Sequence, residues 1–279
     1  MKIKIVADSS ANLFSLAGID FASVPLKVNC NGKEYVDVPS LDLAGMVYDL
    51  KHTKSRSGTS CPNVQEWLDA FGDAEWIFAF TITSNLSGSY AAAVQAKEDY
   101  LAEHPQAKVC VVDSLTAGAE IAMLAEKARD CLLAGSSFEE TEAAVREYAT
   151  HTRTLFSLES MTNLANNGRV SAAAAKLAGI LGIRAIGKAS DVGTLEMLCK
   201  CRGEDKALAT MFEEMLKNGF CGGCLRISHC MNPKAADQLK KLALDRFPQT
   251  RVIVEPCGAL CIFYAEQGGL IIGYDDIAG

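Results

Sequence analysis

Two kinds of block alternate along the first half of the chain: short apolar runs and longer stretches of strong helix formers. Trp76–Ile82 and Lys108–Val112 are short and rich in β-branched or aromatic residues, which is typical of strands buried on both faces. Ala91–Lys97 and Thr116–Leu133 follow them and are dominated by residues that favour helices. The alternation predicts an α/β domain over residues 1–150, with a mostly parallel sheet flanked by helices.

From about residue 151 the pattern changes to hairpins interleaved with helices. Arg184–Lys188 and Thr194–Arg202 are predicted as paired strands around a Ser-Asp-Val-Gly turn. Pro233–Phe247 is predicted to be a helix, and Arg251–Tyr274 is expected to be mostly extended. This half of the chain predicts an α+β domain over residues 151–279 with a largely antiparallel sheet.

A hydroxyl-rich turn, Thr83–Tyr90, separates the strand at Trp76–Ile82 from the helix after it. The first turn of a helix carries free N–H groups and the positive end of the helix dipole, so such a turn favours an anion. Asp8–Ser10 and Asp113–Ser114 also follow predicted strands. Because ligands bind beyond the carboxyl ends of parallel strands, we expect these three turns to converge on one anion site.

A second hydroxyl cluster, Thr59 and Ser60, stands just before Pro62. Hydroxyls ahead of an early helical proline suit an N-cap, so a helix is expected to begin here and to continue through Phe71. Thr59 and Ser60 therefore join Ser87 as candidates for the anion site.

The composition narrows the function by exclusion. A net charge of −7 argues against nucleic acid as a partner, because proteins that bind nucleic acid usually carry a basic excess. Met1 leads directly into an alternating strand pattern at Lys2–Val6, which does not resemble a signal peptide, and no apolar run reaches the roughly 18 residues of a membrane span. Eleven cysteines without a signal peptide are expected to be reduced thiols, so a cytoplasmic protein is predicted.

The residues by themselves also leave an enzyme and a metal module open. Ser87 is the candidate nucleophile of a serine acyl hydrolase or acyltransferase, although Asn85 and Ser89 stand where the nucleophile elbow G-x-S-x-G has glycines. The candidate ligands of a zinc site are Cys199, Cys201, Cys221 and Cys224. Neither a G-x-x-x-x-G-K-[ST] nor a G-x-G-x-x-G motif is present, so nucleotide binding is not expected.

A basic cluster stands out in this acidic chain: Lys200, Arg202 and Lys206. It is either a solvated face or a docking surface for an acidic or phosphate-bearing partner. Arg169, in the sequence Asn-Gly-Arg, is interpreted as an ion-pairing residue, and an arginine after glycine can also hold a domain interface. His229, at the end of a predicted strand, is interpreted as a partly buried turn histidine.

Five short motifs, in order across nearly the whole chain, resemble those of the DegV family, bacterial fatty-acid-binding proteins that include the acyl-binding subunit of fatty acid kinase. They are Asp8-Ser9-Ser10, Thr59-Ser60-Cys61-Pro62, Leu86-Ser87-Gly88-Ser89-Tyr90, Gly168-Arg169-Val170-Ser171 and Lys200-Cys201-Arg202. The family patterns for the last four are T-S-Q-P, L-S-G-T-Y, G-R-[IV]-S and K-V-R. No single motif is specific, and it is their common order that carries the resemblance.

The resemblance implies a lipid-binding protein that does no chemistry itself, with a long-chain fatty acid buried between the two domains. Thr59 and Ser87 would hold the carboxylate with their hydroxyls, with Ser60 in the same group, and Gly88 would add its backbone N–H. The tail would run into a tunnel lined by apolar residues of the second domain, for which Ala172–Leu181 is the best candidate. No catalytic residue, cofactor or metal is implied.

The resemblance also implies a partner. Kinase-linked members offer the fatty acid carboxylate to an ATP-dependent kinase that makes acyl-phosphate. Lys200, Arg202 and Lys206 match the region implied in docking that kinase or an anionic surface, which includes transient contact with a membrane. Arg169 would hold the domain interface.

One position departs from the family. Members usually carry a T-H-x-G-P-G segment near the C-terminus, whose histidine sits by the carboxylate, and Tyr264 stands in its place here. A phenol can donate a hydrogen bond to a carboxylate, but it supplies no positive charge at neutral pH. Tyr264 is therefore expected in the carboxylate site, and the change weakens the expectation of a kinase partner.

Overall fold

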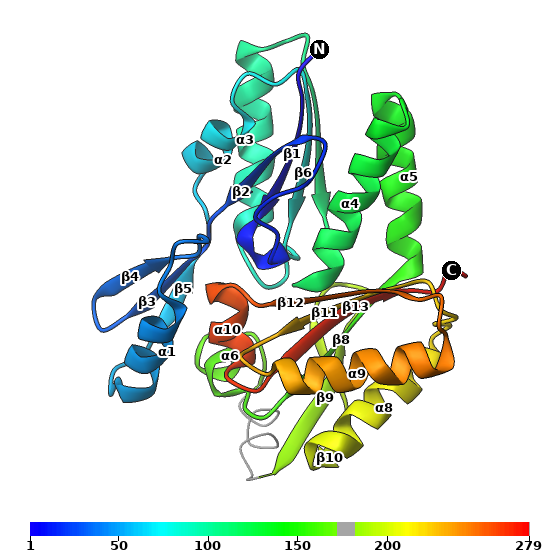
Figure 1. The fold of residues 1–279 in the computed structure, drawn as a ribbon. Helices are drawn as coiled ribbons and strands as arrows, with labels where there is room; N and C mark the ends of the chain where they lie inside the picture. The colour runs from blue at the N-terminus through cyan, green and yellow to red at the C-terminus, as the bar shows by residue number, and fades with distance from the viewer. Residues whose placement is uncertain (172–181, 279) are drawn as a thin grey trace.

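The computed structural model describes residues 1–171 and 182–278, and these residues form two large sheets and one small one (Figure 1). The first sheet has the strand order β2-β1-β6-β7, and all its neighbouring strands run parallel. Its strands are β1 Ile3–Asp8, β2 Asp20–Val24, β6 Trp76–Thr81 and β7 Lys108–Asp113. All four therefore end at the same edge, where the predicted turns lie.

Helices cover both faces of this parallel sheet. They are α2 Val64–Phe71, α3 Ser89–Glu103, α4 Ala119–Leu133 and α5 Phe138–His151. α2 and α3 share one hydrophobic cluster with Val6, whereas α4 and α5 share another with Ile5. Because successive strand residues point to opposite faces, these two neighbours on β1 belong to different cores.

The second large sheet has the order β10-β9-β8-β13-β11-β12, and only the β11–β12 pair is parallel. Its strands are β8 Thr152–Leu158, β9 Ile183–Ala189, β10 Leu195–Arg202, β11 Cys224–His229, β12 Arg251–Pro256 and β13 Leu270–Asp275. Helices α8 (Glu204–Lys217) and α9 (Pro233–Arg246) pack on one face. On the other face α4 approaches closely, since a Cβ added to Gly273 would lie 2.8 Å from the backbone nitrogen of Glu120.

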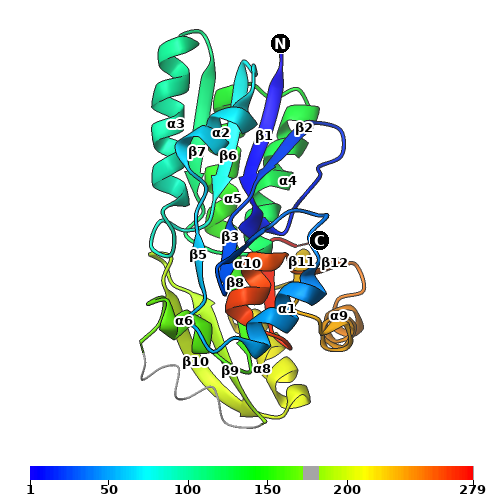
Figure 2. The same cartoon turned by 90° about the vertical axis from the view of Figure 1, so that its left-hand side faces the viewer.

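A small antiparallel sheet stands beside the junction of the two large ones. It has the order β4-β3-β5, with β3 Lys27–Cys30, β4 Lys33–Val36 and β5 Gly58–Ser60. Helix α1 (Leu43–His52) comes between β4 and β5 in the chain and lies against helix α10 (Ala259–Ala265), as Figure 2 shows. The remaining short elements are the 3-10 turn Ser9–Ala11 and helix α6 Thr162–Asn166.

The structure confirms the predicted fold class, a parallel N-terminal sheet flanked by helices followed by a mostly antiparallel sheet. The division at residue 150 stays a prediction. α5 ends at His151 and β8 begins at Thr152, while Val28 and Met46 from the first half share a core cluster with Phe156 and Phe263 from the second.

Two local predictions were wrong. The helix predicted to run through Phe71 is present as α2, but Thr59 and Ser60 do not cap it, because they lie on strand β5. Its cap is Asn63, whose side chain accepts from the N–H of Glu66 in a reciprocal capping box. The segment Arg251–Tyr274 was expected to be mostly extended, yet it contains helix α10. Among the described residues, no helix is long and apolar enough to cross a membrane.

Candidate functional site

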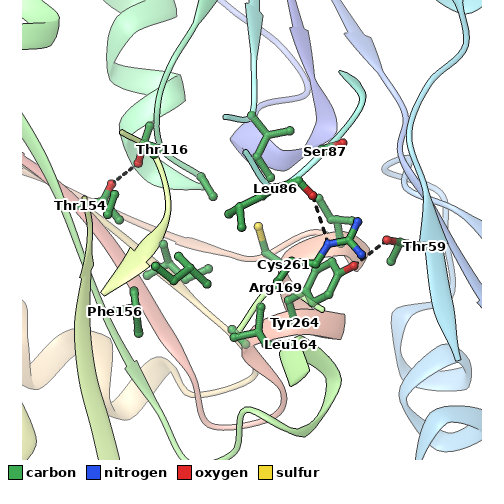
Figure 3. Close-up of a pocket in the computed structure, with 18 of the residues that line it drawn as sticks. Thr59, Leu86, Ser87, Thr116, Thr154, Phe156, Leu164, Arg169, Cys261 and Tyr264 are labelled. Carbon is green, nitrogen blue, oxygen red and sulfur yellow. Dashed lines mark hydrogen bonds between the residues drawn. The ribbon is translucent and has the colours of Figure 1, made fainter. Parts of the chain in front are cut away.

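A cavity lies where the carboxyl edge of the parallel sheet meets the antiparallel sheet and α10 (Figure 3). Most of its described lining is apolar and includes Phe156, Leu164, Leu195 and Ile271. The polar lining residues are Thr59, Ser87, Thr116, Thr154, Arg169 and Tyr264. Among the described lining residues, Arg169 alone carries a charge. The cavity therefore suits a mostly apolar ligand with an anionic group.

Four of the polar residues meet on one side of the cavity, which we call the carboxylate end: Thr59, Ser87, Arg169 and Tyr264. The hydroxyls of Thr59 and Tyr264 lie 2.7 Å apart. The guanidinium carbon of Arg169 lies 5.8 Å from the centre of the Tyr264 ring. Hydroxyl donors and a cation together are what a carboxylate needs, because charge-assisted hydrogen bonds are the strong ones.

Arg169 also joins the two halves of the chain. Its Nε donates to the carbonyl of Leu86 at 3.1 Å, so a residue that follows α6 holds the loop after β6. The role of Arg169 at a domain interface stays a prediction, and the structure places Arg169 among the residues that line the cavity.

The loop that carries Ser87 is folded on its own backbone. The N–H groups of Leu86 and Ser87 both donate to the carbonyl of Thr83, at 3.1 and 3.3 Å, and the N–H of Ser89 donates to Oγ of Ser87 at 3.3 Å. Gly88 is the N-cap of α3 and is exposed, and its N–H has no acceptor within the part of the chain that the structure describes. A ligand oxygen at this helix start would meet a free donor.

A buried carboxylate, Asp8, holds this loop from beneath. Asp8 lies at the end of β1 and accepts hydrogen bonds from Ser10, from the hydroxyl of Ser89 at 2.7 Å and from the N–H of Ile82 at 2.9 Å. Burial raises the pKa of Asp8 above its ordinary value, and the hydrogen bonds from Ser10, Ser89 and Ile82 oppose that rise. Asp8 thus joins its own turn to the loop after β6. The third predicted turn does not share this cavity, because Asp113 and Ser114 line a separate, polar pocket.

Helix α10, which carries Tyr264, is held by two side chains that the sequence did not single out. Asp37 accepts from the N–H groups of Ala259 and Leu260 at 2.6 and 3.1 Å, and Asn12 accepts from that of Gly258 at 2.8 Å. Burial raises the pKa of Asp37, against the hydrogen bonds from Leu260 and Ala259. These contacts join residues more than two hundred positions apart, so no local pattern could have revealed them.

Several predicted residues lie elsewhere. Ser60 follows Thr59 on β5 and is not among the described residues that line the cavity, as expected from the alternation of strand side chains. Lys200, Arg202 and Lys206 are exposed on β10 and at the start of α8, and they do not line the cavity either. The tail-lining candidate Ala172–Leu181 falls outside the described residues.

The structure gives no support to the enzyme and zinc hypotheses. No histidine is among the described residues that line the cavity: His104 stacks on Tyr100, and His151 bonds Asp276. Among the described residues, no histidine therefore stands beside Ser87 to act as the base of a serine nucleophile. Within residues 1–171 and 182–278, no three or more His, Cys, Asp or Glu side chains are grouped so as to bind a metal, which contradicts the four-cysteine zinc site.

His229 ends β11, half-buried, as interpreted from the sequence. Its Nδ1 is buried without a hydrogen-bond partner among the described residues, and burial lowers its pKa.

Comparison with known proteins places the whole chain in one family. A family model described as "Uncharacterised protein, DegV family" matches residues 2–275. A DegV domain-containing protein of Streptococcus pneumoniae strain R6 is 40% identical over 279 residues, which cover 99% of each chain.

Two solved structures are similar throughout. A DegV family protein from Eubacterium eligens, loaded with heptadecanoic acid, is 41% identical with a TM-score of 0.97, over 99% of this chain and 100% of that one. The Streptococcus pneumoniae Fatty Acid Kinase (Fak) B3 protein, loaded with linoleic acid, is 40% identical, also with a TM-score of 0.97 and the same coverage.

Proposed function

The chain belongs to the DegV family, and we propose that it binds a long-chain fatty acid in the cavity between its two large sheets. The observation that carries this proposal is the make-up of the cavity, which has mostly apolar walls and, at the carboxylate end, hydroxyls together with one guanidinium. Two proteins at 40–41% identity were solved with a fatty acid bound. The same fold and the mostly apolar cavity of this chain support the same ligand class here.

The carboxylate is held by donors from three separate segments. Thr59 and Ser87 provide hydroxyls, and Tyr264 provides a phenol in place of the family histidine. Gly88 follows Ser87 at the start of α3 and offers its N–H as a further donor, although it is not among the described residues that line the cavity. Arg169 supplies the positive charge that the phenol does not. Because the compensating charge comes from a guanidinium, it does not depend on a titrating imidazole.

The tail dominates affinity and the carboxylate end sets orientation. Burying about fourteen methylenes at roughly 0.8 kcal/mol each gives a gross gain on the order of 11 kcal/mol. Each charge-assisted hydrogen bond adds only about 1.5–3 kcal/mol. The affinity for a fatty acid should therefore depend mainly on the length of its hydrocarbon tail. The carboxylate should always lie at the Thr59–Tyr264 pair.

We also propose that the protein presents its ligand to a fatty acid kinase and performs no chemistry itself. The support is the similarity to the Fak B3 protein. The basic cluster of Lys200, Arg202 and Lys206 is exposed and separate from the cavity, so a partner or an anionic membrane surface can dock there without displacing the ligand. Replacing Arg202 by Glu should lower kinase-dependent acyl-phosphate formation and leave fatty acid affinity unchanged. A parallel loss of affinity would count against a separate docking surface.

A cytoplasmic location fits this function. All eleven cysteines are free thiols, several of them buried, which suits a reducing compartment.

Denaturing extraction of the freshly isolated protein followed by mass spectrometry tests the ligand. We expect a long-chain fatty acid at close to one molecule per chain. No lipid in the extract, even after growth in lipid-rich medium, together with no binding of added fatty acid, would overturn the proposal. Covalent labelling of Ser87 by a fluorophosphonate would instead favour the hydrolase.

A further inference from the structure

The cavity has a second polar site, away from the carboxylate end. Thr116, after β7, and Thr154, on β8, both line the cavity, and we call them the threonine pair. Figure 3 places this pair and the Thr59–Tyr264 pair on opposite sides of the cavity. Both threonines are buried, with 2% and 5% of their surface exposed. An acyl chain that starts at Tyr264 has this pair beside its hydrocarbon portion.

The hydrogen bonds around the pair run in one direction. The hydroxyl of Thr116 donates to Oγ1 of Thr154 at 2.7 Å, and the hydroxyl of Thr154 donates to Oε2 of Glu120 at 2.6 Å. The other oxygen of Glu120 accepts from Thr152 at 2.6 Å. The proton of Thr116 is thus directed to Thr154, and that of Thr154 to Glu120.

This direction leaves an acceptor at the cavity wall. A hydroxyl has one proton and two lone pairs. Thr154 uses its proton and one lone pair in the chain of bonds, whereas Thr116 uses only its proton. No described residue donates a hydrogen bond to Oγ1 of Thr116. The hydrogen bond from Thr116 to Thr154 connects the loop after β7 with β8 and uses the proton of Thr116. It leaves both lone pairs of Thr116 Oγ1 without a donor among the described residues.

The surroundings of the pair suit a polar substituent. Thr154 and Ala189 line both the apolar cavity and a second, polar pocket. Arg153, Lys188 and Ser190 also line that second pocket, so polar side chains lie close to the cavity wall at this point. A plain hydrocarbon chain passes the threonine pair without using its acceptor. A hydroxyl on the chain would satisfy it, and would otherwise lose its hydrogen bonds to water on entering the cavity.

We propose that the cavity accepts fatty acids that carry a hydroxyl group on the acyl chain, and that Oγ1 of Thr116 accepts the hydrogen bond from that hydroxyl. The inference rests on the proposed function, because it requires the acyl chain to occupy the cavity. It extends the ligand class from plain to hydroxylated long-chain acids, with the threonine pair as the determinant of where the hydroxyl lies.

A displacement assay with a fluorescent fatty acid tests this, using stearic acid and isomers of hydroxystearic acid with the hydroxyl at successive carbons. We expect one isomer, or two adjacent ones, to bind about as tightly as stearic acid, while the other isomers lose tenfold or more. Thr116→Val keeps the shape of the side chain and removes its oxygen. Relative to stearic acid, it should weaken the favoured isomer by roughly threefold to tenfold.

Two further variants keep the test decisive. Thr116→Ser retains the hydroxyl and should retain the preference, even if Thr116→Val fails to fold. Thr141→Val is the matched control, because Thr141 is buried on α5, has no hydrogen-bond partner among the described residues and does not line the cavity. Thr141→Val should change neither the affinity for stearic acid nor that for the favoured hydroxystearic acid isomer.

Normal binding of stearic acid with a uniform loss for every hydroxy isomer would overturn the inference alone. Equal losses of both ligands in Thr116→Val would do the same. Absence of stearic acid binding by the unaltered protein would instead overturn the proposed function.

Discussion

Two buried aspartates anchor the two sides of the carboxylate end, and they do so in different ways. Asp8 holds the loop after β6 from within the parallel sheet, through two serine hydroxyls and one backbone N–H. Asp37 reaches from the small sheet to the first turn of α10 and accepts from two backbone N–H groups there. The first anchor follows from sheet topology, because neighbouring parallel strands end together. The second exists only because distant parts of the chain meet.

The difference matters because each anchor controls one half of the carboxylate end. The loop after β6 carries Ser87 and Gly88, and α10 carries Tyr264. α10 has seven residues, too few to be stable alone in water, so it depends on its cap and on its packing. We therefore expect α10 to be the more easily disturbed of the two.

The largest effect is expected from Asp37→Ala. It leaves the N–H groups of Ala259 and Leu260 without acceptors in the buried first turn of α10. The free energy of unfolding should fall by about 2–4 kcal/mol, measured by urea denaturation. Asp42→Ala is the matched control, because Asp42 caps α1 in an exposed position and its loss should cost about 1 kcal/mol. Equal losses of stability in both variants would show that Asp37 stabilises the fold no more than an exposed helix cap does.

The double variant Thr59→Ala with Ser87→Ala removes one donor from each side of the carboxylate end. Fatty acid affinity should fall by roughly 2–3 kcal/mol, or about 30- to 150-fold, because charge-assisted hydrogen bonds are lost. Affinity for the corresponding methyl ester should change far less. A titration with both ligands checks the difference, and equal losses would show that these hydroxyls do not meet the carboxylate.

Asp8→Asn should alter how stability depends on pH. The folded pKa of Asp8 is raised from its ordinary value of 3.8, so between that value and the raised pKa the folded state binds more protons than the unfolded state. Stability from this group therefore falls as pH rises through that window, by at most about 1.4 kcal/mol per pH unit. Denaturation from pH 4 upward should show the stability of the wild type falling relative to Asp8→Asn. A relative rise would contradict the burial of a charge at this position.

The smallest effect is expected from Tyr264→Phe, which keeps the ring beside Arg169 and removes one hydroxyl. Fatty acid affinity should fall by about 0.5–1.5 kcal/mol. Tyr264→His sharpens the comparison by restoring the family residue. Its affinity should decline as pH rises through about 6.5, where imidazole loses its charge, while the wild type shows no such decline. Titrations with fatty acid at several pH values check this difference. The same pH dependence of affinity in both proteins would contradict it.

The sequence by itself determined the fold class, the strand-end turns and most of the carboxylate end. Buried parallel strands have continuous apolar runs, and their ends share an edge, so Ser87 and Gly88 could be placed from local patterns. Tyr264 was identified by its place in a family motif, and Thr59 was identified by its hydroxyl. Thr59 was predicted at the start of a helix, whereas it lies on strand β5. The segment Ser60-Cys61-Pro62 before α2 resembles a helix cap. Hydrogen bonding to β3 nevertheless makes Gly58–Ser60 a strand.

Only the tertiary structure decided which polar groups face the ligand and which hold the site together. The Thr59–Tyr264 contact, the approach of Arg169 to Leu86 and the capping of α10 by Asp37 each join residues at least 80 positions apart. The threonine pair joins a loop and a strand, and the sequence pattern singled out neither threonine. Local patterns report the period and the ends of an element, whereas these contacts depend on how elements pack, and packing is set by the whole chain at once.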